Sequence, residues 1–189
     1  MAYIFDPEVL HDCARRGVGL PPSEMFDAVT AELDRRYPGL IEKKRNWIFN
    51  NAGGAMGVLT LLYASPREYL IFFGSPIGTE GHSGRYSAEV YDFMIDGEMW
   101  CYVEGQFDRT VYRPGDAAYL GRSMAKGYCI KDHGWMLEYS RGSIALMFPF
   151  GLADSVWSTL DWKSIGRIFG NFIRLWVRTL GRKPGKPAK

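Results

Sequence analysis

The spacing of apolar positions changes twice along the chain, from helical to alternating near residue 65 and back to helical near residue 149. In the first stretch, apolar residues recur every three or four positions, at Phe26, Val29, Leu33 and Tyr37. Ser23 follows two prolines and is a suitable N-cap, and Pro38–Gly39 ends the pattern. The pattern predicts an amphipathic helix packed on a core.

A segment of small residues follows at 51–57, and Val58, Leu59, Leu61 and Leu62 come directly after it. This composition predicts a close-packed helix whose glycines allow another backbone to approach closely. The glycines do not form a phosphate-binding loop, because the GxxxxGK[ST] pattern is absent.

Short alternating segments occupy the middle of the chain and are separated by turn residues such as Asp96–Gly97, Arg113–Asp116 and His133–Gly134. They predict eight strands, at 68–73, 85–95, 98–104, 109–113, 116–120, 127–131, 135–140 and 143–148. Strands this short and regularly spaced indicate a small β-barrel or jelly roll, whose closure would remove exposed edges.

The last forty residues return to helical spacing with a broad apolar face, three tryptophans at 157, 162 and 176, and arginines at 167, 174 and 178 on another face. One interpretation is a helix that lies in a membrane interface, with its tryptophans at the headgroup level. The other is a helix packed on the core with a solvated basic face.

The charge distribution bears on that choice. Eight of the 23 Lys and Arg residues lie after Trp162 and none of the 21 Asp and Glu residues does, so the first 162 positions carry a net charge of −6. An acidic body with a basic end favours an anionic partner. No nucleic-acid-binding motif accompanies the charge, so a membrane surface is the expected partner and nucleic acid is not.

We expect attachment at the surface of a membrane, in a peripheral or monotopic manner. The longest uncharged apolar candidate, 142–153, is shorter than the roughly 18 residues that span a bilayer. The first residues contain acids and lack the apolar core of a signal peptide. Three cysteines without a CxxC spacing argue against a disulfide framework.

These patterns predict a single mainly β domain in four regions. They are an N-terminal helical region (1–64), a cupin-like β-barrel (65–148), amphipathic membrane-associated helices (149–181) and a basic tail (182–189).

The histidines give no support for a metal site in this barrel. A metal-binding cupin uses a His-x-His pair, a nearby Glu and a later His, whereas His11, His82 and His133 are far apart. No serine or cysteine lies in a recognisable nucleophile motif. We therefore expect neither a metal nor a cofactor.

Carboxylates remain as candidate chemical groups. On the strand that begins near Tyr86, the even positions are mostly apolar and Asp92 shares their face, while Glu138 lies among apolar neighbours on a later strand. Two carboxyls in one apolar cavity would share a proton and exchange it with a substrate. The alternative is that Asp92 makes a surface contact and Glu138 pairs with Arg85 or Arg141.

Several sequence blocks resemble the family of fungal-type sterol C8-isomerases and sigma-1 receptors, in one order from about residue 25 to 175. The blocks are 46–57 (NWIFNNAGGAMG), Ser65-x-x-Glu68-Tyr69-Leu70, Gly81-His82-Ser83-Gly84, Tyr112-x-Pro114-Gly115, Glu138-x-x-x-Gly142 and Phe150-x-x-x-Asp154. The start at 3–7, the run 78–82 and Pro149-Phe150-Gly151 are more similar to the isomerase branch. The pairing of Asp92 with Glu138 is more similar to the receptor branch.

The resemblance implies a cupin-like barrel with flanking helices, a C-terminal helical pair on the membrane, a homotrimer and a hydrophobic cavity. Eukaryotic members of the family carry an N-terminal transmembrane helix, and this chain begins after the expected place of that helix. Attachment would then rest on the C-terminal helices.

The resemblance also implies the site and two functions. Glu138 would be the principal acid, with Asp92 or Glu89 as its partner. Tyr69, Phe73, Tyr86, Trp135, Ser83 and Phe148 would contact the substrate. The first function is a Δ8-to-Δ7 double-bond shift in a sterol through a carbocation, which cationic amphiphilic amines would mimic and inhibit. The alternative is a non-enzymatic receptor for hydrophobic amines or steroids.

Overall fold

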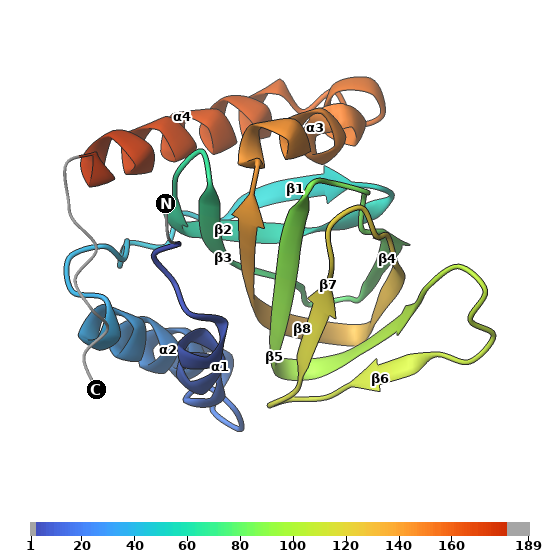
Figure 1. Ribbon diagram of the computed structural model, residues 1–189, viewed down its shortest axis with the longest axis horizontal. Coiled ribbons are helices and arrows are strands. Elements are labelled where there is room, and N and C mark those ends of the chain that lie inside the picture. The colour runs from blue at the N-terminus through green and yellow to red at the C-terminus, as the bar shows by residue number, and fades with distance from the viewer. Residues whose placement is uncertain (1–2, 181–189) are drawn as a thin grey trace.

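The computed structural model describes residues 3–180, and the basic tail expected at 182–189 lies outside them. Two N-terminal helices, α1 (Pro7–Arg15) and α2 (Pro22–Arg36), lie on one side of the strands. Two C-terminal helices, α3 (Phe148–Trp157) and α4 (Trp162–Thr179), lie on the opposite side (Figure 1). Asp6 caps α1 by accepting from the Glu8 N–H, and Pro7 occupies its first position. The prediction that Ser23 is the N-cap of the next helix is wrong, since α2 begins at Pro22 and its N-cap is Pro21.

The sheet is antiparallel. Its eight strands are β1 (Ile48–Ala52), β2 (Ala55–Ala64), β3 (Glu68–Ser75), β4 (Thr79–His82), β5 (Ala88–Tyr102), β6 (Thr110–Tyr112), β7 (Ala117–Leu120) and β8 (Gly127–Gly142). Their order is β1-β2-β3-β8-β5-β6, with β4 beside β8 and β7 beside β5. The predicted mainly β class with flanking helices is confirmed. The predicted closure of the sheet into a barrel is not found. Among the described strands, β1 and β6 are the two ends of the sheet and do not pair with each other.

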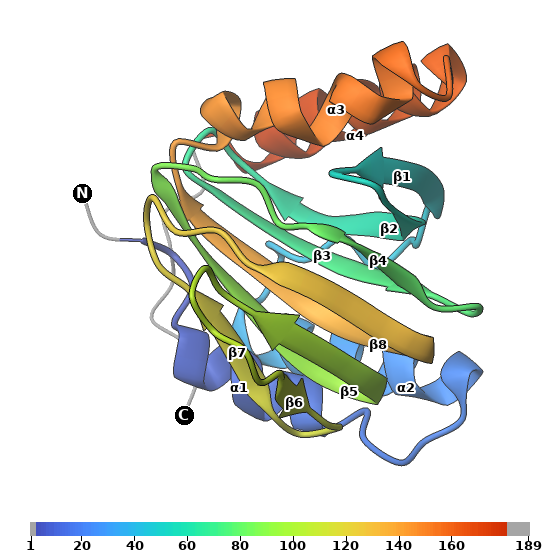
Figure 2. The same cartoon turned by 90° about the vertical axis from the view of Figure 1, so that its right-hand side faces the viewer.

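The long strands β5 and β8 pair along most of their length and contribute to two layers (Figure 2). Their register shifts between Met94 and Asp96 and again between Gly97 and Glu98. At this bend Gly97 has φ 78°, and a Cβ atom there would lie 2.1 Å from the His133 carbonyl oxygen. Only glycine fits that backbone. One half of the β5–β8 pair therefore pairs with β3 and β7, and the other half pairs with β4 and β6.

Three secondary-structure predictions need correction. The segment expected as a helix at 51–62 forms the β1–β2 hairpin, whose register runs from Ile48–Leu59 to Ala52–Ala55. Its glycines, Gly53 and Gly54, form the turn with positive φ. The strand expected at 143–148 is instead a 3₁₀ turn, η1 (Ile144–Met147), followed by the start of α3. The segments 85–95 and 98–104 join into β5, as 127–131 and 135–140 join into β8.

Alternation along the strands separates two apolar cores. On β8, Leu137 and Tyr139 face the core that includes residues of α1 and α2, whereas Met136 faces the second core, which includes residues of α4. The first core contains large rings such as Phe72 and Phe93, which are at most 2% exposed. The second core surrounds the cavity described below.

The arginines of α4 bind the protein body. Arg167 donates to the Trp47 carbonyl oxygen at 2.9 Å. Arg174 and Arg178 bind the buried Glu42 carboxylate at 2.7 and 3.0 Å. Arg167, Arg174 and Arg178 thus face the protein body instead of lipid, and Arg174 keeps a side chain that is 52% exposed to solvent.

The surface that α3 and α4 leave exposed is largely apolar. Its large exposed side chains are Leu146, Trp157, Leu160, Trp162, Ile173, Trp176, Val177 and Leu180. Within residues 3–180, no helix is both long and apolar enough to cross a bilayer.

Candidate functional site

An apolar cavity of about 190 Å³ lies among the strands and the C-terminal helices. Its walls come from β2 and β3 (Leu59, Leu61, Ile71, Phe73), from β5, β7 and β8 (Val90, Met99, Leu120, Met136), and from the helical end of the chain (Ile144, Met147, Phe148, Phe150, Leu152, Ile168, Phe172). Such a lining with a few polar groups is typical of a site for a hydrophobic small molecule.

The polar groups reach this cavity through the alternation of the strands. Asp92 on β5 and Glu138 on β8 are direct register partners. Both line the cavity, as does Tyr69 on β3. The surface contact considered for Asp92 is wrong, because Asp92 is 5% exposed. The pairing of Glu138 with Arg85 or Arg141 is also wrong, because both arginines pair with other carboxylates. Arg85 pairs with Glu104 and Arg141 pairs with Glu89.

Glu138 carries a carboxyl group whose pKa is raised into the neutral range. Burial in the apolar wall raises the pKa of Glu138 to about 7, and the negative charge of Asp92 acts in the same direction. The Tyr69 hydroxyl donates to Glu138 Oε1 at 2.6 Å and, like the Lys126 ammonium, opposes the rise. A group with such a pKa is suited to give and take protons at neutral pH.

Asp92 has a different neighbour from Glu138. Its Oδ2 atom lies 2.5 Å from Lys126 Nζ, and the two side chains are 7% and 8% exposed. Burial disfavours the Lys126 ammonium, but the charge and hydrogen bond of Asp92, together with Cys101 and Glu138, outweigh it and raise the pKa of Lys126. The backbone of Lys126 is held by Ser83, since the Lys126 N–H donates to Ser83 Oγ at 2.9 Å and its carbonyl accepts from the Ser83 N–H.

The remaining predicted contact residues divide into two groups. Tyr69, Phe73, Ser83, Tyr86 and Phe148 all line the cavity. The Tyr86 hydroxyl donates to the Ser83 carbonyl oxygen at 2.5 Å, which fixes the loop between β4 and β5.

Trp135 is not part of the cavity lining. It packs on the other face of the sheet, with ring centroids 5.5 Å from Trp47 and 5.3 Å from Phe26. The reason is alternation: Trp135 is three positions from Glu138, and an odd separation on a strand points the two side chains to opposite faces.

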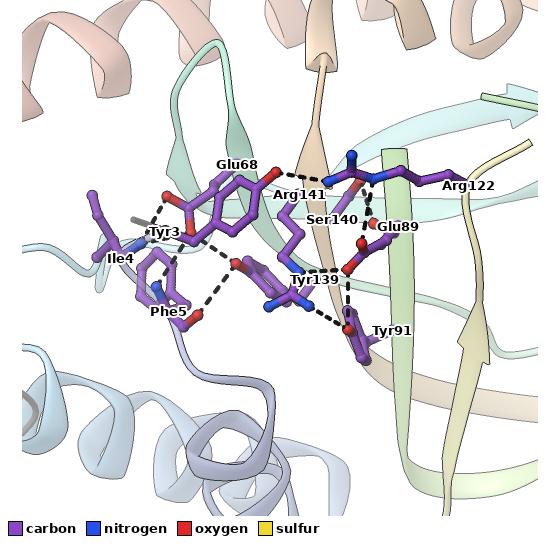
Figure 3. Close-up of polar contacts among 10 residues, drawn as sticks. All are labelled: Tyr3, Ile4, Phe5, Glu68, Glu89, Tyr91, Arg122, Tyr139, Ser140 and Arg141. Carbon is purple, nitrogen blue, oxygen red and sulfur yellow. Dashed lines mark hydrogen bonds and ion pairs between the residues drawn. The ribbon is translucent and has the colours of Figure 1, made fainter. Parts of the chain in front are cut away.

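Glu89 is also on the opposite face from Asp92 and Glu138. Figure 3 shows it beside Arg141, Arg122 and Tyr91. Its carboxylate accepts from Arg141 Nε at 2.6 Å and lies 3.3 Å from Arg122 Nε. Burial raises the pKa of Glu89, but the hydrogen bond and the charge of Arg141 outweigh it, so the pKa lies below its ordinary value. Glu89 is therefore not brought together with Glu138.

Lys126 lines the cavity and was not predicted from the sequence. It lies just before β8, so no alternating pattern surrounds it. Its signal is weak, a lysine within the short run Met124-Ala125-Lys126-Gly127. His82 and Tyr128 were also not predicted as contact residues and line the cavity. Within residues 3–180, no three His, Cys, Asp or Glu side chains lie close enough together to hold a metal ion.

The fold and the cavity define a mainly β protein with an apolar cavity, suited to a hydrophobic small molecule, beside a pair of carboxyl groups. The chain belongs to the ERG2 and Sigma1 receptor like protein family, whose model matches residues 1–182.

Similar proteins include both branches of that family. The protein erg2 homolog of Dictyostelium discoideum is 48% identical over 156 residues, which are 82% of this chain and 67% of that protein. The C-8 sterol isomerase erg2 of Aspergillus fumigatus is 45% identical over 86% of this chain and 70% of its own length. The sigma non-opioid intracellular receptor 1 of Danio rerio is 39% identical over 86% of this chain and 74% of its own length.

Solved structures similar to this one include cupins. A RmlC-like cupin from Shewanella frigidimarina covers 52% of this chain and is itself covered to 85%, with 15% sequence identity and a TM-score of 0.44.

Proposed function

We propose that this protein is a sterol isomerase that moves a ring double bond from Δ8 to Δ7. Relatives named C-8 sterol isomerase, from Aspergillus fumigatus and Neurospora crassa at 45% and 40% identity, support the reaction class. One observation carries the proposal: Glu138 lines an apolar cavity with its pKa raised to about 7. Its proton is thus available at neutral pH inside an apolar site.

The mechanism begins with Glu138 as the acid. Its proton adds to C9, the electron pair of the C8–C9 double bond forms the new C–H bond, and a tertiary cation remains at C8. Loss of a proton from C7 then leaves its electron pair as the C7–C8 double bond. The Asp92–Glu138 pair receives this proton, and no electrons leave the substrate. The reaction is therefore redox-neutral.

Cavity residues stabilise the cation between the two steps. The carboxylate left on Glu138 attracts it, and the faces of Tyr69, Tyr86 and Phe73 add cation–π attraction. Hydrophobic amines carry a similar charge on a similar body, so cationic amphiphilic amines bind as mimics of the cation.

The apolar outer surface of α3 and α4 would rest on a membrane. Trp157, Trp162 and Trp176 are 84%, 61% and 37% exposed, and such rings suit the headgroup boundary. Phe148, Phe150 and Leu152 of α3 line the cavity, which brings the proposed contact surface close to the binding site. A sterol dissolved in the bilayer would then reach the cavity without crossing water.

A homotrimer remains part of the proposal through membership of the family. Light scattering of the purified protein in detergent tests it: a mass of three chains agrees with the proposal, and a mass of one chain contradicts it.

Turnover of a Δ8 sterol tests the proposed function. The purified protein, in detergent micelles, is given the sterol and the product is separated by mass-resolved gas chromatography. We expect a Δ7 product from the wild type and from Glu104→Gln, a control whose side chain is 86% exposed. We expect at least a hundredfold less from Glu138→Gln. Tight amine binding without any turnover would favour the receptor function instead.

A further inference from the structure

Lys126 places a positive charge in a cavity that is proposed to hold a cation. Its ammonium group is 8% exposed, lines the same cavity as Glu138, and binds Asp92 Oδ2 at 2.5 Å. A like charge repels any ammonium ligand or carbocation in a low-dielectric site. Nothing in the proposed proton transfer uses Lys126, so its presence calls for another role.

Other ionisable groups also face the carboxyl pair. Tyr69 on β3 and Tyr128 on β8 line the cavity, as do Tyr86 before β5 and His82 at the end of β4. Burial raises the pKa of each of the three tyrosines, so they stay neutral near pH 7. Cys101 and Tyr112 also interact with the ion pair, and burial raises the pKa of the Cys101 thiol and of the Tyr112 hydroxyl, so both stay neutral as well. His82 is exposed to solvent, which screens its charge. The charge of the buried part of the cavity therefore depends on Asp92, Lys126 and Glu138.

The sum of these charges differs between the two states of Glu138. The ion pair of Asp92 and Lys126 is neutral overall. With a proton on Glu138, the cavity as a whole is neutral and suits an uncharged sterol. After Glu138 gives up its proton, the cavity has one net negative charge, which matches the carbocation formed in the same step.

We propose that Lys126 is a specificity-determining residue: it occupies Asp92 as a counter-ion, leaves Glu138 as the proton carrier, and thereby makes the cavity prefer a neutral sterol over an ammonium ligand. This inference deepens the proposed isomerase function and rests on it for the identity of the neutral substrate. The predicted effect of Lys126 on ammonium binding depends only on the charges in the cavity, and it is tested separately from sterol turnover.

Removal of the Lys126 charge would change the state of both carboxyls. In Lys126→Met, Asp92 and Glu138 remain as adjacent buried acids, and such a pair shares one proton over a wide pH range. The cavity then keeps a net negative charge at pH 6, where the wild type is neutral. Ammonium binding gains, and the shared proton is released only at higher pH.

The opposite change follows from removal of Asp92. In Asp92→Asn, the Lys126 ammonium loses its partner and is left to pair with Glu138. The cavity then has no net negative charge in either state of Glu138. Ammonium binding falls, so the two variants change the affinity in opposite directions. A merely structural role for the ion pair would weaken binding in both.

Calorimetric titration with N,N-dimethyldodecylamine between pH 6 and 9 tests the inference, with 1-dodecanol as a neutral probe of the same chain length. Lys43→Met serves as the control, since Lys43 forms an exposed pair with Asp34. At pH 6 we expect Lys126→Met to bind the amine at least about tenfold more tightly than the wild type and the control. At pH 8 we expect Asp92→Asn to bind it at least about tenfold more weakly. Dodecanol binding should change by less than about threefold.

The same variants are assayed for sterol turnover across pH. We expect the alkaline fall in activity to lie at higher pH in Lys126→Met than in the wild type. If Lys126→Met does not fold, Lys126→Gln replaces it: the amide can still donate a hydrogen bond to Asp92 but carries no charge, so we expect the same gain in amine affinity at pH 6. Equal amine affinities in all folded variants would overturn the inference. If no protein makes a Δ7 sterol but the amine affinities diverge as stated, the isomerase proposal fails and the charge-setting role of Lys126 stands.

Discussion

Asp92 and Glu138 are direct register partners on β5 and β8, yet they have different hydrogen-bond partners. Asp92 accepts from the Lys126 ammonium, whereas Glu138 accepts from the neutral Tyr69 hydroxyl. An ammonium partner favours the ionised carboxylate far more than a neutral hydroxyl does. The structure thus gives two carboxyls of the same cavity different partners, an ammonium for Asp92 and a neutral hydroxyl for Glu138. Different surroundings for two acids of one site are a common arrangement for acid–base chemistry.

The identity of the partner acid is tested by two neutral substitutions. We expect Asp92→Asn to lower sterol turnover at least about tenfold, because Lys126 is then left to pair with Glu138. We expect Glu89→Gln to retain turnover within about twofold, since Glu89 binds Arg141 and Arg122 on the opposite face. Initial rates at pH 7 check both. Loss of activity in Glu89→Gln alone would contradict this assignment.

The raised pKa of Glu138 also predicts how stability depends on pH. The folded chain holds this proton up to a pKa of about 7, whereas the unfolded chain releases it near 4.5. The stabilisation is therefore complete below pH 4.5 and is lost as pH rises toward 7, by about 3 kcal/mol in total.

Urea unfolding of the wild type and Glu138→Gln at several pH values measures this loss. Glu138→Gln cannot titrate at this position, so its stability should rise relative to the wild type by about 3 kcal/mol between pH 4.5 and 7. Above about pH 8 the difference should stay constant. A difference that does not vary with pH would show that Glu138 titrates normally.

Glu68 fixes the N-terminal segment to the sheet and is 3% exposed. Its carboxylate accepts from the Ile4 and Phe5 N–H groups at 2.9 and 3.2 Å and from the Tyr139 hydroxyl at 2.7 Å (Figure 3). We expect Glu68→Gln to lower the free energy of unfolding by about 2 kcal/mol, because a buried charge-assisted acceptor is lost. Chemical denaturation measures it, with the exposed Glu24→Gln as the control. Equal loss in both variants would contradict the prediction.

Membrane binding should depend on the apolar surface of α4 and not on its arginines. Ile173 and Val177 are 53% and 58% exposed, and burial of both in lipid contributes about 2 kcal/mol. We expect Ile173→Glu/Val177→Glu to lower the fraction bound to vesicles of phosphatidylcholine and anionic phosphatidylserine at least about tenfold in a flotation assay. Arg174→Gln should bind as the wild type does, since Arg174 pairs with Glu42. The reverse pattern would restore the electrostatic interpretation.

The mainly β class could be predicted from sequence because alternation and turn residues are local signals. The β1–β2 hairpin could not, since Gly53 and Gly54 fit either a close-packed helix or a turn, and pairing with β3 decides between them. Residues 143–148 are apolar enough for a buried strand. They leave the sheet because Gly142 has φ 143° and the chain turns there into η1.

The position of Asp92 on the cavity face could be predicted because Asp92 alternates with apolar residues such as Val90 on one strand. The candidate role of Glu138 came from the sequence blocks shared with the family. One site residue was missed and one residue was wrongly placed in the site, each for a physical reason. Lys126 approaches Asp92 across 34 positions of sequence, a contact that no local spacing encodes. Trp135 was expected in the cavity because of its ring, but its odd separation from Glu138 points it to the other face.

Isotope delivery from Glu138 tests the central claim most directly. Excess protein, equilibrated in D₂O, is mixed with a Δ8 sterol for a single turnover, and the Δ7 product is examined by mass spectrometry and NMR. Since the Glu138 carboxyl exchanges its proton for deuterium beforehand, we predict one deuterium at C9 in the product of the wild type. Glu138→Gln should form no labelled product in the same time. A Δ7 product without deuterium at C9, or equal labelling by Glu138→Gln, would contradict the role of Glu138 as the acid.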